Sequence, residues 1–297
     1  MKILLFGKDG QVGWELQRSL APLGEVIALG TRSAPLCGDF RDLQGLAQTV
    51  ASVKPDAIIN AAAYTAVDKA ESEPDAAATV NALAPGVLAK AAQEIGACVI
   101  HYSSDYVFDG SGDRPWAETD EPFPLNVYGC TKLEGERLIA QSCPRHLILR
   151  TSWVYASRGA NFAKTMLRLA RERDRLTVID DQIGSPTGAD LLADITAHAL
   201  RAALRRPEVA GTYHAVAQGE TSWHGYANHV IEFARALGQP IKVAPGAIKP
   251  VPTSAFPTPA RRPNNSRMDT HKLRSTFGLA LPPWQGGVER MLTEVLG

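Results

Sequence analysis

The chain has 297 residues, of which 45% are hydrophobic and 21% are charged. This composition is typical of a globular protein that can bury one large core or two smaller ones. Lys plus Arg number 31 and Asp plus Glu number 31, so the zero net charge gives no support for a nucleic-acid partner. No apolar run approaches the ~20 residues of a membrane span, and the opening run is too short for a signal peptide.

The cysteines are scattered and have no histidine partners at metal-binding spacing: Cys37, Cys98, Cys130 and Cys143. This pattern favours reduced thiols over a disulfide framework or a zinc site. We therefore expect a cytoplasmic protein.

Short apolar runs predict buried strands at residues 2–6, 26–29, 56–60, 98–102 and 146–150. They lack polar alternation, which is typical of parallel strands covered on both faces. Amphipathic segments between them, such as 12–20, 43–53 and 81–96, predict helices. This alternation indicates an α/β fold with a Rossmann-type doubly wound parallel sheet.

After about residue 155 the alternation weakens. Segments 161–173 and 223–238 predict helices and 211–217 a strand, whereas the prolines of 249–269 exclude a regular helix or central strand and predict an ordered loop. We expect a dinucleotide-binding domain over residues 1–155 and a smaller, mixed α/β substrate domain over 156–297, with the chain crossing between them.

Three glycines follow the first predicted strand, at Gly7, Gly10 and Gly13. Glycines at a strand–turn–helix junction allow a tight turn and a close approach of the backbone to a pyrophosphate. We favour this interpretation over a plain turn, and it makes the intervening Gln11 and Val12 candidate cofactor contacts.

The second predicted strand ends without the carboxylate that would accept from an adenosine ribose hydroxyl. Arg32 stands there instead and would pair with a 2′-phosphate, which favours NADPH over NADH. The alternative is a solvated loop arginine. Asp39 and its neighbour Phe40 are candidate contacts at the adenine end.

The fourth strand leads into Ser103 and Ser104, at the edge where ligands bind in such sheets, and Tyr128 and Lys132 follow at Y-x-x-x-K spacing. This combination resembles the extended branch of the short-chain dehydrogenase/reductase superfamily. A ketone that accepts a hydride needs a proton donor, which Tyr128 would be. Lys132 would lower the tyrosine pKa by its charge and bind the nicotinamide ribose, and Ser104 would hold the carbonyl oxygen.

A series of motifs in chain order sharpens the resemblance: GKDGQVGWEL, NAAAYTAVDKAE, SSDYVF, YGCTKLEGE, RTSWVYA, GSPTGA and PTPARRPNNSR. It is similar to that of the dTDP-4-dehydrorhamnose reductase family over nearly the whole chain. The resemblance implies reduction of the 4-keto group of a dTDP-sugar, making dTDP-L-rhamnose for cell-surface polysaccharide. Ser104 departs from the threonine that is common in the family.

The resemblance also implies further contacts. Those to the cofactor are Ala62, Ala63, Tyr64 and Thr65, and those to the substrate are Asp105, Trp153, Arg261 and Arg262. Some relatives pair their subunits through acidic residues and Mg²⁺, which makes a homodimer possible here. The matching positions are Glu15, Asp190 and Glu294, with aspartate at 190 where glutamate is seen; solvated helix charges are the simpler alternative.

Three other functions occur on sequences of this kind. A sugar-nucleotide 4,6-dehydratase would have Asp-Glu after the strand-four hydroxyl, whereas Asp105 is followed here by Tyr106, which counts against dehydration. A 4-epimerase that retains NAD, and a non-catalytic regulatory subunit of the same fold, stay open. The intact Ser104, Tyr128 and Lys132 favour catalysis.

Overall fold

The computed structural model describes residues 1–297, and its centre is a six-stranded sheet with the order β10-β5-β4-β3-β1-β2. Every neighbouring pair is parallel. The five predicted strands are confirmed, and β4 runs two residues further than predicted, so that it contains both serines. The strands are β1 Lys2–Phe6, β2 Glu25–Leu29, β3 Ala57–Asn60, β4 Cys98–Ser104, β5 His146–Thr151 and β10 Gly211–His214.

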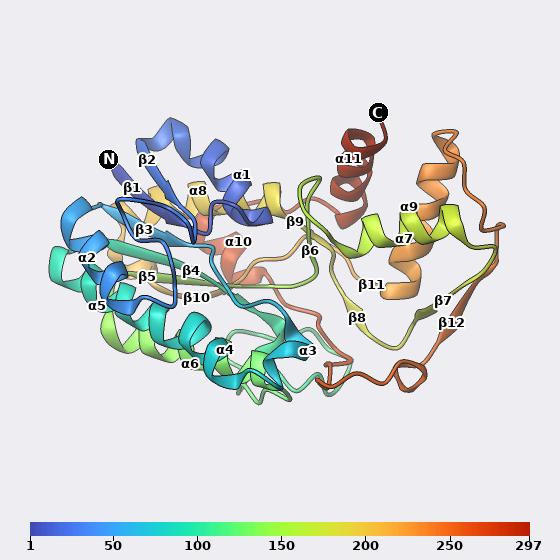
Figure 1. Ribbon diagram of the computed structural model, residues 1–297, viewed down its shortest axis with the longest axis horizontal. Helices are drawn as coiled ribbons and strands as arrows, with labels where there is room; N and C mark the ends of the chain where they lie inside the picture. The colour runs from blue at the N-terminus through green and yellow to red at the C-terminus, as the bar shows by residue number, and fades with distance from the viewer.

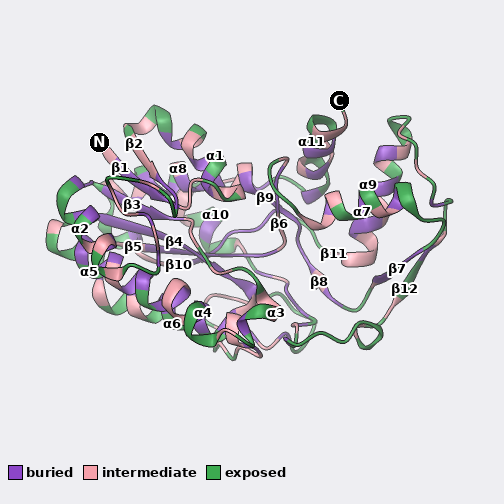
Figure 2. Ribbon diagram, viewed as in Figure 1, coloured by how far each residue is buried: buried purple, intermediate pink, exposed green.

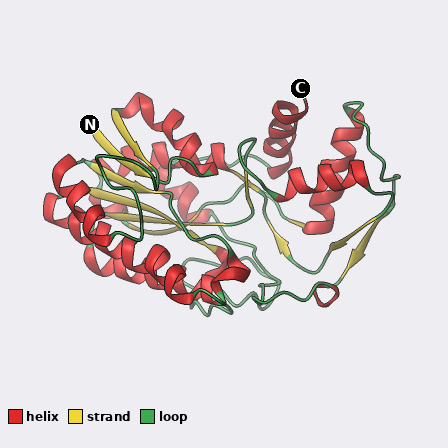
Figure 3. Cartoon of the chain, viewed as in Figure 1, coloured by secondary structure: helices red, strands yellow, loops and turns green.

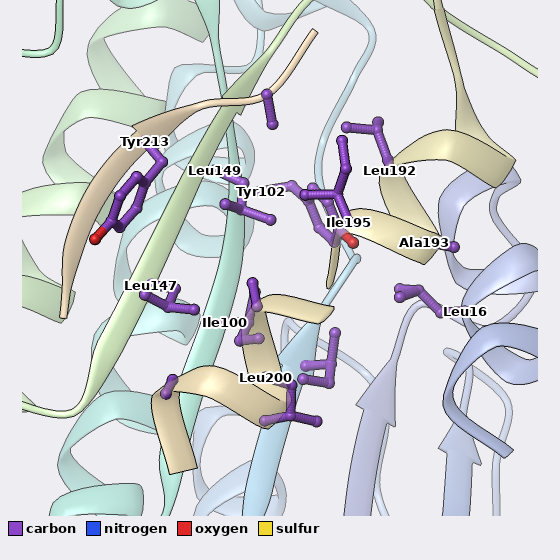
Figure 4. Close-up of a cluster of buried hydrophobic side chains, with 14 of the residues drawn as sticks. Leu16, Ile100, Tyr102, Leu147, Leu149, Leu192, Ala193, Ile195, Leu200 and Tyr213 are labelled. Atoms are coloured by element: carbon purple, nitrogen blue, oxygen red, sulfur yellow. The ribbon is translucent and has the colours of Figure 1, made fainter. Parts of the chain in front are cut away.

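Helices cover both faces of this sheet, as Figure 1 shows. One face carries α1 (Gln11–Leu20), α8 (Ala189–Arg205) and α10 (His271–Phe277), and the other carries α2 (Leu43–Val53), α5 (Ala84–Ile95) and α6 (Val127–Ser142). In Figure 4, Leu16 and Leu192 approach Ile100 and Leu149 of the sheet between these layers. The predicted doubly wound α/β fold is confirmed.

The remaining helices α7 (Phe162–Glu172), α9 (Trp223–Ala236) and α11 (Trp284–Leu296) enclose a second core around Tyr226. The short strands form two-stranded sheets: β7 (Leu176–Ile179) with β12 (Ile248–Val251), β8 (Ile183–Gly184) with β11 (Thr221–Ser222), and β6 (Val154–Tyr155) with β9 (Thr187–Gly188). Figure 3 shows these helices away from the large sheet, with most of the short strands on the same side of the molecule and β6 and β9 between them and the sheet.

The proline-rich segment 249–269 is predicted as a loop, but its first residues belong to strand β12, which contains Pro250. A two-stranded sheet has only edge strands, where a missing N–H is tolerated. The rest of the segment contains one short 3-10 helix (Thr253–Ala255) and otherwise runs as loop past the short helix α3 (Val67–Ala70), as Figure 1 shows; α4 (Pro74–Ala78) follows α3.

Residues beyond 155 contribute to both parts of the molecule. β10 extends the large sheet beside β5, and α8 packs against α1 on one face of it. A cut at residue 155 therefore does not separate the large sheet from the rest of the chain. Figure 2 shows burial concentrated in the sheet and on the inner faces of the helices. None of the helices combines the length and apolar content that a bilayer crossing requires.

Candidate active site

A cavity of about 740 Å³ opens at the carboxyl edge of the large sheet. Parallel strands place the loops that follow them at one edge, which is where such sheets bind ligands. The lining comes from the glycine turn, the loop after β3, the end of β4 and the start of α6: Gly7, Gly10, Gln11, Val12, Ala62, Ala63, Thr65, Tyr102, Ser103, Tyr128 and Lys132 are among its residues.

The glycine turn forms the floor of this cavity. Gly7 has a φ of +84°, and a Cβ on it would lie 2.6 Å from the carbonyl carbon of Ala61. A Cβ on Gly13 would collide with the carbonyl oxygen of Gly7. Only glycine fits at both positions, and α1 begins at Gln11 with its free N–H groups beside the cavity. This cradle fits the pyrophosphate of a dinucleotide.

Ser104 ends β4 within a short buried network. Its hydroxyl donates to Asp105 Oδ1 at 2.8 Å and accepts from the Tyr106 N–H at 3.1 Å. Burial raises the pKa of Asp105 to about 6, against the opposing effect of hydrogen bonds from Ser266 and Ser104. Asp105 therefore changes charge within the range in which enzymes operate.

Tyr128 lies in the first turn of α6. The Asn126 side chain caps this helix by accepting from the Gly129 N–H at 2.8 Å. The Tyr128 ring packs edge-on against Tyr106, with centroids 5.6 Å apart. Burial raises the pKa of Tyr128 to about 12, while a hydrogen bond with Ser104 acts in the opposite direction. The side chains of Ser104 and Tyr128 are therefore neighbours.

Lys132 is buried one helical turn further along α6. Its Nζ donates to the Tyr102 carbonyl oxygen at 2.6 Å and lies 3.1 Å from His101 Nε2. Burial lowers the pKa of Lys132 to about 8, and Glu136 partly opposes this. In this arrangement the Lys132 amine is directed toward Tyr102, and the pKa of Tyr128 is shifted by burial, Ser104 and Asp105.

Several predicted cofactor contacts lie outside the cavity lining. Asp39 pairs with Arg41 at 2.6 Å, and Phe40 packs on Phe6 in the core. The Tyr64 hydroxyl donates to Glu73 at 2.8 Å. Arg32 is exposed beside the cavity-lining Thr31.

Other residues at the cavity were not predicted. Arg158 lines it, with its guanidinium 4.1 Å from the centroid of the Trp14 ring. The Asp9 carboxylate lies against Gly30, and the Lys8 side chain passes the same glycine. Lys8 and Asp9 could have been predicted from the sequence, because they lie within the glycine turn. No local sequence pattern marks Arg158.

A second cavity, of about 490 Å³, begins at Tyr106 and extends into the part of the molecule built by α7 and α9. It combines aromatic side chains with guanidinium groups: Tyr106, Phe162, Trp223, Phe256, Arg173, Arg175 and Arg262 are in its lining.

The other predicted substrate contacts lie near this second cavity. Trp153 stacks on Trp223 with ring centroids 3.6 Å apart. Arg261 is exposed, and its carbonyl accepts from Asn126 at 2.7 Å. Of the two predicted arginines, Arg262 lines the second cavity.

The three carboxylates suggested for Mg²⁺ line a separate cavity of only about 40 Å³, together with Arg290. Arg290 lies 3.4 Å from Asp190 and 3.5 Å from Glu294, and Glu15 pairs with Arg18 at 3.4 Å. No group of three acidic, histidine or cysteine side chains in the chain could hold a metal ion. Within this single chain, each of the three carboxylates lies within 3.5 Å of a guanidinium group.

A doubly wound sheet with a glycine cradle, and a serine, a tyrosine and a lysine at its carboxyl edge, define an NAD(P)-dependent oxidoreductase of the short-chain dehydrogenase/reductase class. Comparison with known proteins identifies the family within this class. The family model described as RmlD substrate binding domain matches residues 1–296.

A dTDP-4-dehydrorhamnose reductase of Escherichia coli is 61% identical over 99% of this chain and 98% of its own length. Solved structures of two such reductases cover nearly all of both chains. One, from Clostridium acetobutylicum, has a TM-score of 0.91 at 34% identity and covers 100% of each chain. The other, from Bacillus anthracis in complex with NADP, has a TM-score of 0.89 at 35% identity and covers 99% of each. The chain belongs to the dTDP-4-dehydrorhamnose reductase family.

Proposed function

We propose that this chain reduces the 4-keto group of dTDP-4-dehydro-L-rhamnose, giving dTDP-L-rhamnose for cell-surface polysaccharide. The observation that carries the proposal is that Tyr128 and Lys132 line the cavity of the glycine cradle, with Ser104 beside Tyr128 at the end of β4. Curated relatives over the whole length of the chain support the choice of substrate.

Tyr128 is the proton donor. When bound, the nicotinamide cofactor supplies a hydride to the carbonyl carbon, and negative charge develops on the carbonyl oxygen. Because burial raises the pKa of Tyr128 to about 12, its phenol keeps its proton at neutral pH and delivers it to that oxygen. The single hydroxyl proton of Ser104, which goes to Asp105 in this structure, turns to the carbonyl oxygen of the bound substrate and holds it in place.

The nucleotide part of the substrate occupies the second cavity. Its aromatic side chains, among them Trp223 and Phe162, offer stacking faces for a thymine ring. Arg173, Arg175 and Arg262 supply the positive charge that a diphosphate requires. Asp105, buried beside Ser104, contacts the sugar.

NADPH is the preferred cofactor. The Lys8 side chain passes Gly30, and the exposed Arg32 follows it two residues later in the chain, where an adenosine 2′-phosphate would lie. The Asp9 carboxylate at the same glycine is the element that would favour NADH. Comparing kcat/KM for NADPH and NADH in wild type and Arg32→Ala tests this preference: a fall confined to NADPH supports it, and an equal effect on both contradicts it.

The experiment for the activity follows the absorbance of NADPH after addition of dTDP-4-dehydro-L-rhamnose. Tyr128→Phe lowers kcat by about 100- to 10,000-fold, the usual range for loss of a general acid. Ser104→Ala also lowers kcat, whereas Ser104→Thr keeps the hydroxyl and the activity. The assignment fails if wild type gives no turnover or if Tyr128→Phe is fully active. An NAD molecule that copurifies and never exchanges would instead favour a 4-epimerase.

A further inference from the structure

Lys132 stands at the end of a chain of buried side chains that runs from β3 through β4 to α6. Its Nζ lies 3.1 Å from Nε2 of His101. On the other side of the imidazole, Nδ1 lies 2.9 Å from Nδ2 of Asn60. Asn60, His101 and Lys132 are each at most 1% exposed, so the hydrogen bonds of the imidazole are made to these two neighbours.

The backbone determines the direction of these hydrogen bonds. The Ala62 N–H can only donate, and it lies 3.0 Å from the side-chain oxygen of Asn60. The amide nitrogen of Asn60 therefore faces His101 and donates to Nδ1. A neutral imidazole that accepts at Nδ1 carries its proton on Nε2, and that N–H points toward Lys132.

A charged Lys132 would leave one donor facing another. An ammonium group has three donors and no acceptor, so it would meet the N–H of His101 directly. If the imidazole proton were on Nδ1 instead, that N–H would face the amide N–H of Asn60. If the Asn60 amide were then flipped, its N–H would face the backbone N–H of Ala62. A neutral amine, with its lone pair toward His101 and an N–H donated to Tyr102, satisfies every group.

We propose that Asn60 and His101 are positioning residues that set the protonation state of Lys132 by favouring its neutral amine over the ammonium form in this arrangement. The inference rests on the proposed role of Lys132 in the reduction and adds the residues that control it. When Lys132 turns away from His101 toward the cavity that it lines, it would take up a proton from solvent, and that proton would replace the one that Tyr128 gives to the substrate.

The other titratable groups around Lys132 are compatible with this assignment. Glu136 on α6 raises the Lys132 pKa, but it is held by Arg150 of β5 at 2.6 Å. Tyr128 on α6 stays neutral, and Asp105 after β4 bonds to Ser104. Burial, which lowers the pKa of Lys132 to about 8 and that of His101 well below its usual value, acts in the same direction as the hydrogen bonds.

The first test is the tautomer of His101 in the protein without added nucleotide. Long-range proton–nitrogen NMR of histidine side chains distinguishes the two neutral forms, and the spectrum of His101→Gln identifies the signal. We expect the Nε2–H form in wild type. Asn60→Asp should reverse it to Nδ1–H, because a carboxylate can only accept. Asn81 is also buried, but its side chain bonds to Tyr64 and Thr131, so the control variant Asn81→Asp should leave the His101 tautomer unchanged.

The second test is the pH profile of kcat. In Asn60→Asp, His101 Nε2 becomes an acceptor and stabilises the ammonium form, so the loss of activity at alkaline pH should move upward by about one pH unit or more. Asn81→Asp should not move it. An Nδ1–H tautomer in wild type, or an unmoved profile in Asn60→Asp, overturns the proposal. If Asn60→Asp does not fold, or if the substrate is not turned over, the tautomer of His101 measured in wild type is by itself the test of the proposal.

Discussion

Arg262 and Asp68 form a two-point ion pair, Nη1 to Oδ1 and Nη2 to Oδ2 at 2.8 Å each, although 194 residues separate them. The pair joins the loop after β12 to the short helix α3. It lowers the pKa of Asp68 and raises that of Arg262. Because Arg262 also lines the second cavity, Asp68 orients a guanidinium that faces the proposed diphosphate site.

Replacing Asp68 by Asn should therefore weaken substrate binding more than it slows the chemical step. The amide keeps the size of the side chain but releases Arg262 from its fixed orientation. We expect KM for the sugar nucleotide to rise about 3- to 10-fold, the equivalent of roughly 1 kcal/mol for a partly exposed pair. The matched control is Asp120→Asn, which breaks a similar two-point pair with Arg114 outside both proposed ligand cavities. Equal effects of the two variants would contradict the role of Asp68.

Much of the large sheet is predictable from sequence, because its strands and the glycine turn are local patterns. The runs that become β1 to β5 are apolar over adjacent residues, and Gly7 and Gly13 mark the turn by their spacing. The pairing of Asp68 with Arg262 is not predictable, since nothing in either segment records a contact across 194 residues.

The candidate site, like the fold, is predictable from the sequence only in part. The serine, tyrosine and lysine are found from spacing, whereas the surroundings that tune them are not. In the sequence, His101 is a single polar residue within an apolar strand, and nothing marks it as part of the site. Asn60 and Lys132 reach its two ring nitrogens only in the folded protein. Phe40 was expected at the cofactor because of its place in the chain, yet its side chain packs in the core.

The buried ion pair between Glu136 and Arg150 should be essential for stability. Both side chains are about 5% exposed, and Arg150 Nη2 lies 2.6 Å from Glu136 Oε2. Glu136→Gln leaves a buried guanidinium without a counter-charge, which costs about 3–5 kcal/mol of unfolding free energy. Chemical denaturation measures the loss. Glu134→Gln, in an exposed pair on the same helix, should cost under about 1 kcal/mol. A similar small cost for both would show that the buried pair does not stabilise the fold.

Asp105 should make the protein less stable as pH rises from about 4 to about 6. Burial raises its pKa in the folded state to about 6, above the unfolded value near ~3.9. The protonated form therefore stabilises the fold fully below the unfolded pKa, and this contribution is lost as pH rises through the folded one. Asp105→Asn carries no such charge, so relative to wild type it should be more stable at pH ~7 than at pH ~4, by about 2 kcal/mol. Urea unfolding at both pH values measures this difference, and a difference of zero would contradict it.

Gly184 should be intolerant of any side chain because of Trp153. A Cβ on Gly184 would lie 2.8 Å from Trp153 Cε2, and Trp153 already has an unusual φ of +49° and stacks on Trp223. In Gly184→Ala the Trp153 ring must move, which disturbs the stack beside the second cavity and costs about 1–3 kcal/mol of stability. We expect altered tryptophan fluorescence together with a raised KM for the sugar nucleotide. Gly286→Ala on α11, where a Cβ meets no atom within 4 Å, is the matched control and should stabilise the helix slightly. If Gly184→Ala leaves both fluorescence and KM unchanged, the Trp153–Trp223 stack does not shape the substrate site.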